Sequence, residues 1–330
     1  MSVQEKIGGV GIVAVATIVL GLASPTVAQQ LEDEFVRTLE VTGQVDLEVS
    51  TGAGSISVRT GADGSVRVEG RIRARDSSRY TTAELQRRID AIVGNPPVEQ
   101  QGNAVRVGDL DEDARCGLRI SYELVVPEAT SLRSQSGSGS QTIDDLAGPV
   151  EAAAGSGSLT IGRIGGRVTA HAGSGSIQVD AARGALEVST GSGSIRASEV
   201  DGGIESSSGS GSVELEQIGA GDVSVRTGSG SIRVRGVDGA LEVRTGSGSI
   251  VADGGMGGDW RLESSSGGIR VALPDNAAFE LDARTSSGRI NSRYPITVVG
   301  SLSGRQLRGE VGGGGQLLEL RTTSGAIRIE

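Results

Sequence analysis

Apolar and polar residues alternate in short runs through most of this chain. In the stretch 231–248, Ile232 and Val234 alternate with arginines, and Leu241 and Val243 alternate with charged residues after a short break. Alternation with a period of two over such short runs, bounded by Asp-Gly and Gly-Ser-Gly turns, predicts half-buried β-strands. Each such stretch is therefore expected to contain two short strands.

The stretch recurs with a nearly constant period. From residue 137 onward a GSGS-like string returns at intervals of about 18 residues, and twice the interval is one residue longer. The second glycine of the string is found at Gly139, Gly157, Gly175, Gly193, Gly211, Gly230, Gly248 and Gly267. A short fixed period is typical of a solenoid, in which each repeat buries its apolar face by stacking on its neighbours.

A third apolar position lies in the break between the two strands of a repeat. It recurs at the same interval and continues one residue late at Val237; its earlier members are Leu146, Ile164, Ala182, Val200 and Ile218. A corner that is apolar in every copy is expected to point inward. We therefore predict an all-β fold, a parallel β-solenoid with about 18 residues per coil, in which coils are ~4.8 Å apart. A left-handed hexapeptide helix would repeat its inward residues every six positions, and this chain does not.

This model of one repeat per coil makes a prediction about charge. Arg196, Glu214 and Arg233 should form one outward ladder, and Glu216 should face Arg235 in the next. Opposite charges would then meet across neighbouring coils.

The region before the regular repeats follows a different pattern. Alternating runs are followed by a capping box at 81–84, after which Leu85, Ile89, Ile92 and Val93 lie on one helical face. Further strands are expected at 104–107 and 118–126. Solenoids need atypical end units that cover the first open strand edge, so this region is interpreted as an N-terminal β-rich cap that contains one short helix.

The first residues of the chain have the features of a signal peptide. Residues 7–22 are an unbroken small and apolar run, and small or β-branched residues precede a cut after Ala28. The alternative is an uncleaved membrane anchor, for which this run is short. The predicted organisation is a signal peptide at 1–28, the cap at 29–130 with its helix at about 81–93, regular coils at 131–290, and irregular C-terminal coils at 291–330.

Several segments together resemble a known family. They are the opening β-runs, the insertion, YELVVPEATSL at 122–132, the train of GSGSI repeats and the ending LLELRTTSGAIRIE at 317–330. In order and spacing they are similar to the bacterial putative-adhesin family of β-strand-repeat proteins, a domain of unknown function. The resemblance covers nearly the whole mature chain and implies an exported or surface β-solenoid. It carries no catalytic motif that could be transferred to this sequence.

Composition narrows the function classes. Glycine supplies 54 of 330 residues, aromatic residues only 2%, and the net charge is −10, so the core must be built from small aliphatic side chains. A negative chain with no basic run is a poor candidate for binding nucleic acid or anionic membranes. Cys116 is the only cysteine, so no internal disulfide can form, and the thiol is either packed near a strand or free to cross-link chains.

The search for catalytic and metal-binding motifs returns weak candidates. His171, the only histidine, should lie outward beside Ser189 and Ser207, but no nucleophile elbow accompanies it, so a solvated surface histidine is favoured. The run 254–259 resembles the start of a calcium-binding nonapeptide, yet it occurs once and is better interpreted as a glycine-rich corner. Four Asp-Gly pairs are interpreted as turn residues in preference to metal ligands: those at Asp63, Asp201, Asp238 and Asp253.

One outward column is expected to be acidic. It is predicted to contain Glu187, Glu205, Glu242, Glu263 and Asp282. Like charges on adjacent strands cost roughly 0.2–1 kcal/mol per pair unless something compensates them. A divalent cation such as calcium could do so, but compensation by Arg226 and Arg244 in the next column is the favoured interpretation.

The sequence thus predicts a non-enzymatic protein with no catalytic residue, cofactor site or metal site. The expected function is that of an exported cell-envelope scaffold or adhesion module, in the periplasm or at the cell surface. Its partner would be an envelope polymer or surface protein, with no nucleic acid and no stable membrane insertion after signal cleavage. The alternative is a polysaccharide-binding or polysaccharide-lyase-like parallel β-helix, which the scarcity of aromatic residues disfavours. Ice binding is disfavoured because the outward faces alternate Glu and Arg rather than presenting threonine ladders.

Overall fold

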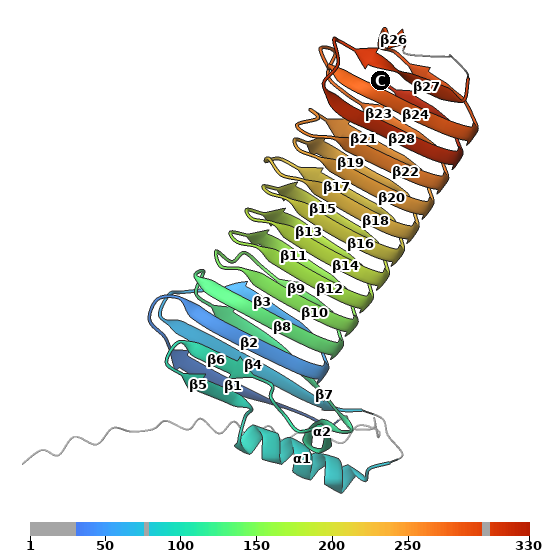
Figure 1. Ribbon diagram of the computed structural model, residues 1–330. Helices are drawn as coiled ribbons and strands as arrows, with labels where there is room; N and C mark the ends of the chain where they lie inside the picture. Colours follow the sequence, from blue (N-terminus) through green and yellow to red (C-terminus); the bar gives the residue numbers. More distant parts are fainter. Residues whose placement is uncertain (1–30, 76–78, 299–303) are drawn as a thin grey trace, which may run out of the picture. The chain divides into compact units, whose positions relative to one another are not determined.

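The computed structural model describes residues 31–75, 79–298 and 304–330. These residues form two long β-sheets, called sheet A and sheet B below, and two helices, α1 (Thr82–Gly94) and α2 (Glu112–Arg115) (Figure 1). In this part of the chain, no helix has the length and apolar character that a membrane span requires. The predicted signal peptide, residues 1–28, lies outside the described residues.

The spatial order of the strands differs from the chain order at both ends of the sheets. Among the described residues, sheet A contains, from one edge to the other, β1 (Glu32–Glu40), β4 (Ser65–Ala74), β7 (Leu118–Val126), β3 (Ile56–Thr60), β9 (Gln141–Ile143), β11 (Leu159–Ile164), β13 (Ile177–Ala182), β15 (Ile195–Val200), β17 (Val213–Gln217), β19 (Ile232–Val237), β21 (Ile250–Gly254), β23 (Ile269–Ala272), β29 (Ile327–Ile329) and β25 (Ile290–Ser292). Sheet B contains β26 (Thr297–Val298), β27 (Gln306–Val311), β24 (Phe279–Ser287), β28 (Gln316–Ser324), β22 (Trp260–Ser266), β20 (Leu241–Ser247), β18 (Val223–Ser229), β16 (Ile204–Ser210), β14 (Leu186–Ser192), β12 (Val168–Ser174), β10 (Val150–Ser156), β8 (Thr130–Ser138), β2 (Val45–Ala53), β6 (Ala104–Val107) and β5 (Val98–Gln101).

Each regular repeat contributes one strand to each sheet, and equivalent strands pair in parallel. Ile177 lies beside Ile195, and Ile195 lies beside Val213, at the offset that the repeat period predicts. Val213 then lies beside Ile232, where the interval is one residue longer. The predicted parallel β-solenoid with one repeat per coil is therefore confirmed.

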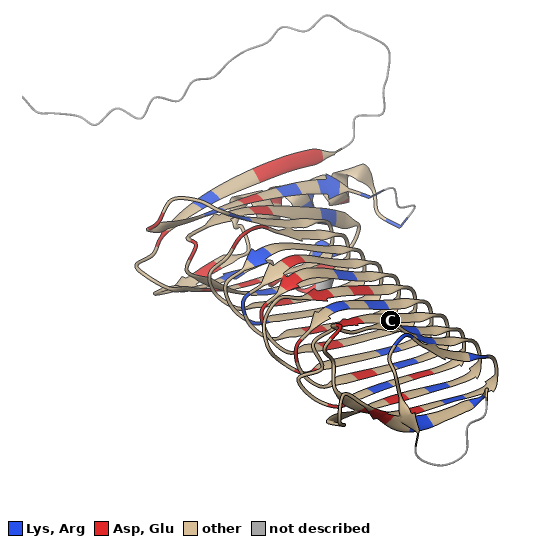
Figure 2. Ribbon diagram, turned by 90° about the horizontal axis from the view of Figure 1, so that it is seen from above, with Lys and Arg blue, Asp and Glu red and all other residues tan. Residues whose placement is uncertain are grey.

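The same register confirms the predicted charge ladder. Arg196 lies beside Glu214 and donates to its carboxylate at 3.1 Å, and Arg233 approaches the same carboxylate at 3.6 Å from the following coil. The hydrogen bond from Arg196 is the main reason why the pKa of Glu214 lies below its ordinary value. Glu216 lies beside Arg235 as predicted, although the guanidinium of Arg235 contacts Glu214, at 3.5 Å. Charged residues of both signs recur along the stacked strands in Figure 2.

The inward corner column follows the prediction until the coil that contains Ile218. Val200 is fully buried, but Ile218 is 58% exposed and Gln217 takes the inward place, at 2% exposure. The cause is a register shift after Ala197, which sets Val200 beside Gln217. The prediction for Ile218 is therefore wrong.

The amide of Gln217 is satisfied inside the corner. Its Nε2 donates to the carbonyls of Gly202 at 2.7 Å and Gly221 at 3.0 Å, while its Oε1 accepts from the backbone N–H of Asp238 at 3.3 Å. A buried amide with these partners is tolerated, whereas an unpaired one would cost free energy.

In several coils a buried hydroxyl group links the coil to the turn of the coil before it. Thr190 donates to the carbonyl of Gly175 at 2.9 Å, and Ser208 donates to the carbonyl of Gly193 at 3.0 Å. The turn glycine itself has no room for a side chain, since a Cβ on Gly211, whose φ is +151°, would lie 2.0 Å from the Gly193 oxygen. The repeated Gly-Ser-Gly string is thus explained by close stacking of turns.

One inward hydroxyl lacks such a bond. The Oγ of Ser206 is buried without a hydrogen-bond partner among the described residues, between Val188 and Val225 of the adjacent strands. Replacement of Ser206 by valine should stabilise the protein by about 1–3 kcal/mol, because it removes an unsatisfied buried hydroxyl. Thermal and denaturant unfolding measure the change. The control is Ser208→Val, which removes a made hydrogen bond and should destabilise; equal effects of the two would contradict the assignment.

The first coil is formed by β2 and β3 and pairs in parallel with β8 and β9. The insertion follows it and comprises the elements from β4 to β7, including α1 and α2. The predicted helix is confirmed as α1, and its capping box joins Thr81 and Glu84: the Thr81 N–H donates to the Glu84 carboxylate at 2.8 Å, and the Glu84 N–H donates to the Thr81 hydroxyl at 3.3 Å. The Thr81 N–H, and the Thr81 hydroxyl that also donates to the Glu84 carboxylate at 2.8 Å, hold the pKa of this carboxylate below its ordinary value. The predicted strands at 104–107 and 118–126 are confirmed as β6 and β7.

The C-terminal strands do not lie at the end of the stack. β28 lies between β22 and β24, and β29 lies between β23 and β25, so the last coil of the chain is inserted between two earlier ones (Figure 1). Leu318 of β28 is buried between Trp260 and Leu281. The chain therefore leaves one coil position vacant after β23 and fills it with its final residues.

Candidate functional site

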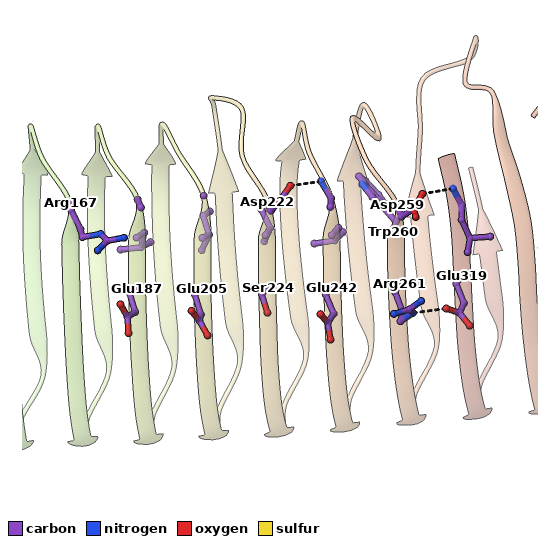
Figure 3. Close-up of a pocket in the computed structure, with 18 residues that line it drawn as sticks. Arg167, Glu187, Glu205, Asp222, Ser224, Glu242, Asp259, Trp260, Arg261 and Glu319 are labelled. Atoms are coloured by element: carbon purple, nitrogen blue, oxygen red, sulfur yellow. Dashed lines mark hydrogen bonds and ion pairs between the residues drawn. The ribbon is translucent and has the colours of Figure 1, made fainter. Parts of the chain in front are cut away.

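A shallow groove runs along the outer face of sheet B, where the strands begin (Figure 3). Its floor is the first outward position of successive strands, and its volume between Arg167 and Glu319 is about 510 Å³. A second hollow of about 570 Å³, which shares Arg167, continues the groove toward β2 and β6. The groove thus crosses many coils and is open to solvent.

Most charges on the groove floor are paired across coils. Arg133 donates to Glu151 at 2.8 Å in the part nearer the insertion. Glu242 is contacted by Arg226 at 3.5 Å and by Arg244 at 3.0 Å, as predicted for the arginines of the next column. Arginine compensation therefore operates at Glu242.

Glu187 and Glu205 differ from these residues. They lie side by side on β14 and β16, as predicted, and within the described residues neither carboxylate has an ion pair or a hydrogen bond. No group of three or more residues in the described ranges is arranged to hold a metal ion. The pair is therefore a place of unbalanced negative charge in the middle of the groove.

For the two remaining predicted members of the acidic column, the prediction is confirmed for one and wrong for the other. Asp282 belongs to the column, beside Glu319, and accepts from Arg284 at 2.9 Å. Glu263 does not: it lies beside Arg244 in the second column, and Arg261 occupies the place predicted for it. Alternation shows only that a residue points outward, and the strand register decides which of the outward columns it joins.

The predicted proximity of His171 and Ser189 is confirmed. The Nδ1 of His171 lies 2.6 Å from the Ser189 Oγ, and Ser207 follows on the next strand. On its other side His171 faces Ala153, so its strand neighbours supply no carboxylate to orient the ring. The imidazole is exposed on an open face. This arrangement lacks the third group of a hydrolytic triad.

The glycine-rich run 254–259 forms the turn between β21 and β22. Met256 is mostly buried there, and Asp259 accepts a hydrogen bond from the Leu317 N–H at 2.9 Å. Asp253 likewise accepts from the Gly236 N–H at 3.1 Å. Asp259 thus lies in the turn, whereas Asp253 lies in β21, so the prediction that it is a turn residue is wrong.

The fold and the groove together define a parallel β-solenoid with a charged outer face that extends over its coils. The family model described as Toastrack DUF4097 matches residues 45–330, and the chain belongs to this family. The resemblance to the putative-adhesin family of unknown function is thereby confirmed. No curated protein matches the sequence.

Matches among solved structures include three bacterial proteins. A putative cell adhesion protein from Clostridium sporogenes is 12% identical, with 91% of this chain and 99% of that chain covered and a TM-score of 0.20. A putative adhesin from Bacteroides fragilis is 12% identical, with coverages of 90% and 97% and a TM-score of 0.26. A putative adhesin from Parabacteroides distasonis is 9% identical, with coverages of 90% and 97% and a TM-score of 0.32.

Proposed function

We propose that the protein is a non-catalytic, exported β-solenoid that acts as a cell-envelope scaffold or adhesion module through its extended outer faces. The observation that carries the proposal is the groove of sheet B, whose charged floor is spread over successive coils rather than gathered into one enclosed site. Its partner would be an envelope polymer or a surface protein that touches several coils at once. Such a surface suits binding along a length rather than chemistry at a point.

The placement of the aromatic residues disfavours a polysaccharide-processing role. Trp260 is fully buried, and its indole N–H donates to the Gly239 carbonyl at 3.1 Å. Tyr80 is half-buried and is covered by the Arg88 guanidinium, 4.5 Å from the ring centroid. The other aromatic residues of the chain are buried: Phe35, Tyr122, Phe279 and Tyr294. Among the described residues, which include every aromatic residue of the chain, none is fully exposed for stacking on a sugar ring, which is how such sites usually hold their substrates.

The binding part of the proposal is tested by capture from the organism's envelope with the purified mature chain. Because contacts would be spread over several coils, Glu205→Gln should weaken capture only modestly. Deletion of residues 177–212, which removes two whole coils and joins Ser176 to Val213 in register, should weaken it strongly without unfolding the rest. Loss of all binding on one substitution, or a hydrolase activity that depends on His171, would overturn the proposal.

Export is tested by the mass of the envelope-derived protein. Cleavage after Ala28 should give a chain that begins near Gln29, and because Lys6 is the only lysine, this chain should contain none. An amine-reactive reagent should then label it once, at the α-amino group. A mature chain that keeps residues 1–28 would contradict this prediction.

A further inference from the structure

A small cavity lies where the insertion meets the first coil. Its volume is about 290 Å³, and its apolar wall includes Leu110 together with Leu118 and Ile120 of β7. The last two are buried. Sites for organic ligands start at about 300 Å³, so the cavity suits a small molecule rather than a polymer.

Two arginines line this cavity without a partner. Arg75 directly follows β4, and Arg115 ends α2. Within the described residues neither guanidinium has an ion pair or a hydrogen bond. The preceding arginine on the same strand, Arg73, is by contrast paired with Glu32 at 2.9 Å. Two unpaired guanidinium groups at one cavity attract an anion, for which their donors are well suited.

Neighbouring residues hold Arg115 in place. Arg88 of α1 donates to the carbonyls of Asp113 and, at 3.2 Å, Cys116, and so ties the segment that carries Arg115 to the helix. Gly52 of β2 leaves the space that the side chain occupies, because a Cβ there would lie 3.2 Å from the Arg115 Cδ. The arginine is thus held against bare backbone beside the cavity.

The cavity also presents a hydroxyl group that has no hydrogen-bond partner among the described residues. Tyr122 of β7 lines it and is 1% exposed, and within the described residues its hydroxyl makes no hydrogen bond. Burial raises the pKa of this hydroxyl, and at neutral pH it is protonated, as an ordinary tyrosine is. Among the described residues Ser206 Oγ is the only buried side-chain polar atom without a partner, so the Tyr122 oxygen is open to the cavity and can donate to a ligand oxygen there.

We propose that this cavity binds a small organic oxyanion, a carboxylate or phosphate monoester with a short apolar substituent. The anionic group lies at Arg75 and Arg115, the substituent packs against Leu118 and Ile120, and the Tyr122 hydroxyl donates to the ligand. The site is separate from the groove of sheet B and independent of the proposed scaffold function.

Modification of Cys116 supplies the test, because this only thiol of the chain lines the same cavity. Hexanoate and hexyl phosphate are the charged probes, and 1-hexanol is the neutral probe of equal chain length. Each charged probe that binds should slow the reaction of Cys116 with a maleimide in the full mature chain, and 1-hexanol should not. Protection by hexanoate alone or hexyl phosphate alone supports the site and identifies the preferred anion.

Substitutions test the assignment of donors. Arg75→Gln and Arg115→Gln should each lower the affinity for the charged probe by at least about tenfold, the size expected for hydrogen bonds to a charged group. Tyr122→Phe should lower this affinity less. Arg119→Gln is the control, since it removes the same charge from β7 outside the cavity lining. The proposal fails if neither anion protects Cys116 at millimolar concentration, if 1-hexanol protects equally well, or if Arg119→Gln weakens binding as much. Equal unfolding temperatures show that the variants remain folded.

Discussion

Replacement of Val200 by aspartate should destabilise the coils around it by about 3–5 kcal/mol, because it leaves an unpaired carboxylate in the closed inward corner. Val200 is fully buried, between Ala182 and Gln217 of the adjacent strands. The loss is measured as a fall in the unfolding temperature and in the denaturant midpoint, since stacked repeats need not unfold in one step.

The neighbouring position provides the control for this prediction. Glu199 is exposed and already has a positive φ of 48°, so alanine there keeps the same backbone strain. Glu199→Ala should change stability by no more than about 0.5 kcal/mol. If the two substitutions had similar effects, the corner would not be the closed interior that the fold implies.

Removal of residues 316–330 should have a still larger effect, confined to one end of the solenoid. β28 pairs with β22 on one side and with β24 on the other, so its loss leaves those strands roughly 9.6 Å apart, twice the strand spacing. Leu318 and Leu320 leave the core with it, and each buried leucine is worth about 2–5 kcal/mol. The backbone amides of β24 that bond to β28 should lose their protection from hydrogen exchange, whereas those of β11 to β19 should keep theirs.

An edge strand of equal length serves as the control. β1 has nine residues, as β28 does, but it pairs only with β4. Removal of residues 32–40 should therefore alter protection in the insertion alone. Unchanged protection of β24 after the C-terminal truncation would show that the inserted coil does not hold the end of the stack.

The regular coils could be predicted from the sequence because their period sets the register directly. Once Arg196 and Glu214 are known to occupy equivalent places in successive repeats, their contact follows. Local irregularities break this logic. Where the interval lengthens, the choice between Gln217 and Ile218 for the inward corner depends on a register shift that hydrophobicity alone assigns wrongly. The same limitation placed Glu263 in the wrong outward column.

The position of the inserted C-terminal coil could not be predicted from the local sequence pattern, for another reason. Residues 317–330 have the alternation of an ordinary repeat, and nothing in that alternation states which coil they join. The cavity of the insertion was missed for a similar cause, since Arg75 and Arg115 are brought together only by the fold. Sequence reasoning could have noted each arginine, but it could not have shown that the two lie at one cavity.

The register of the coils also bears on how such a chain can lengthen by gene duplication. A newly copied coil would set every outward residue beside its own twin, one strand spacing away, so each charged residue would at first face a like charge. Inward aliphatics and turn glycines lose nothing by being identical, and they stay alike from coil to coil. Outward positions gain when one copy changes sign, as Glu214 does between Arg196 and Arg233. Glu187 and Glu205 are a pair in which the two neighbours have the same sign. Physical repulsion alone would therefore favour divergence between neighbouring repeats on the surface and uniformity beneath it.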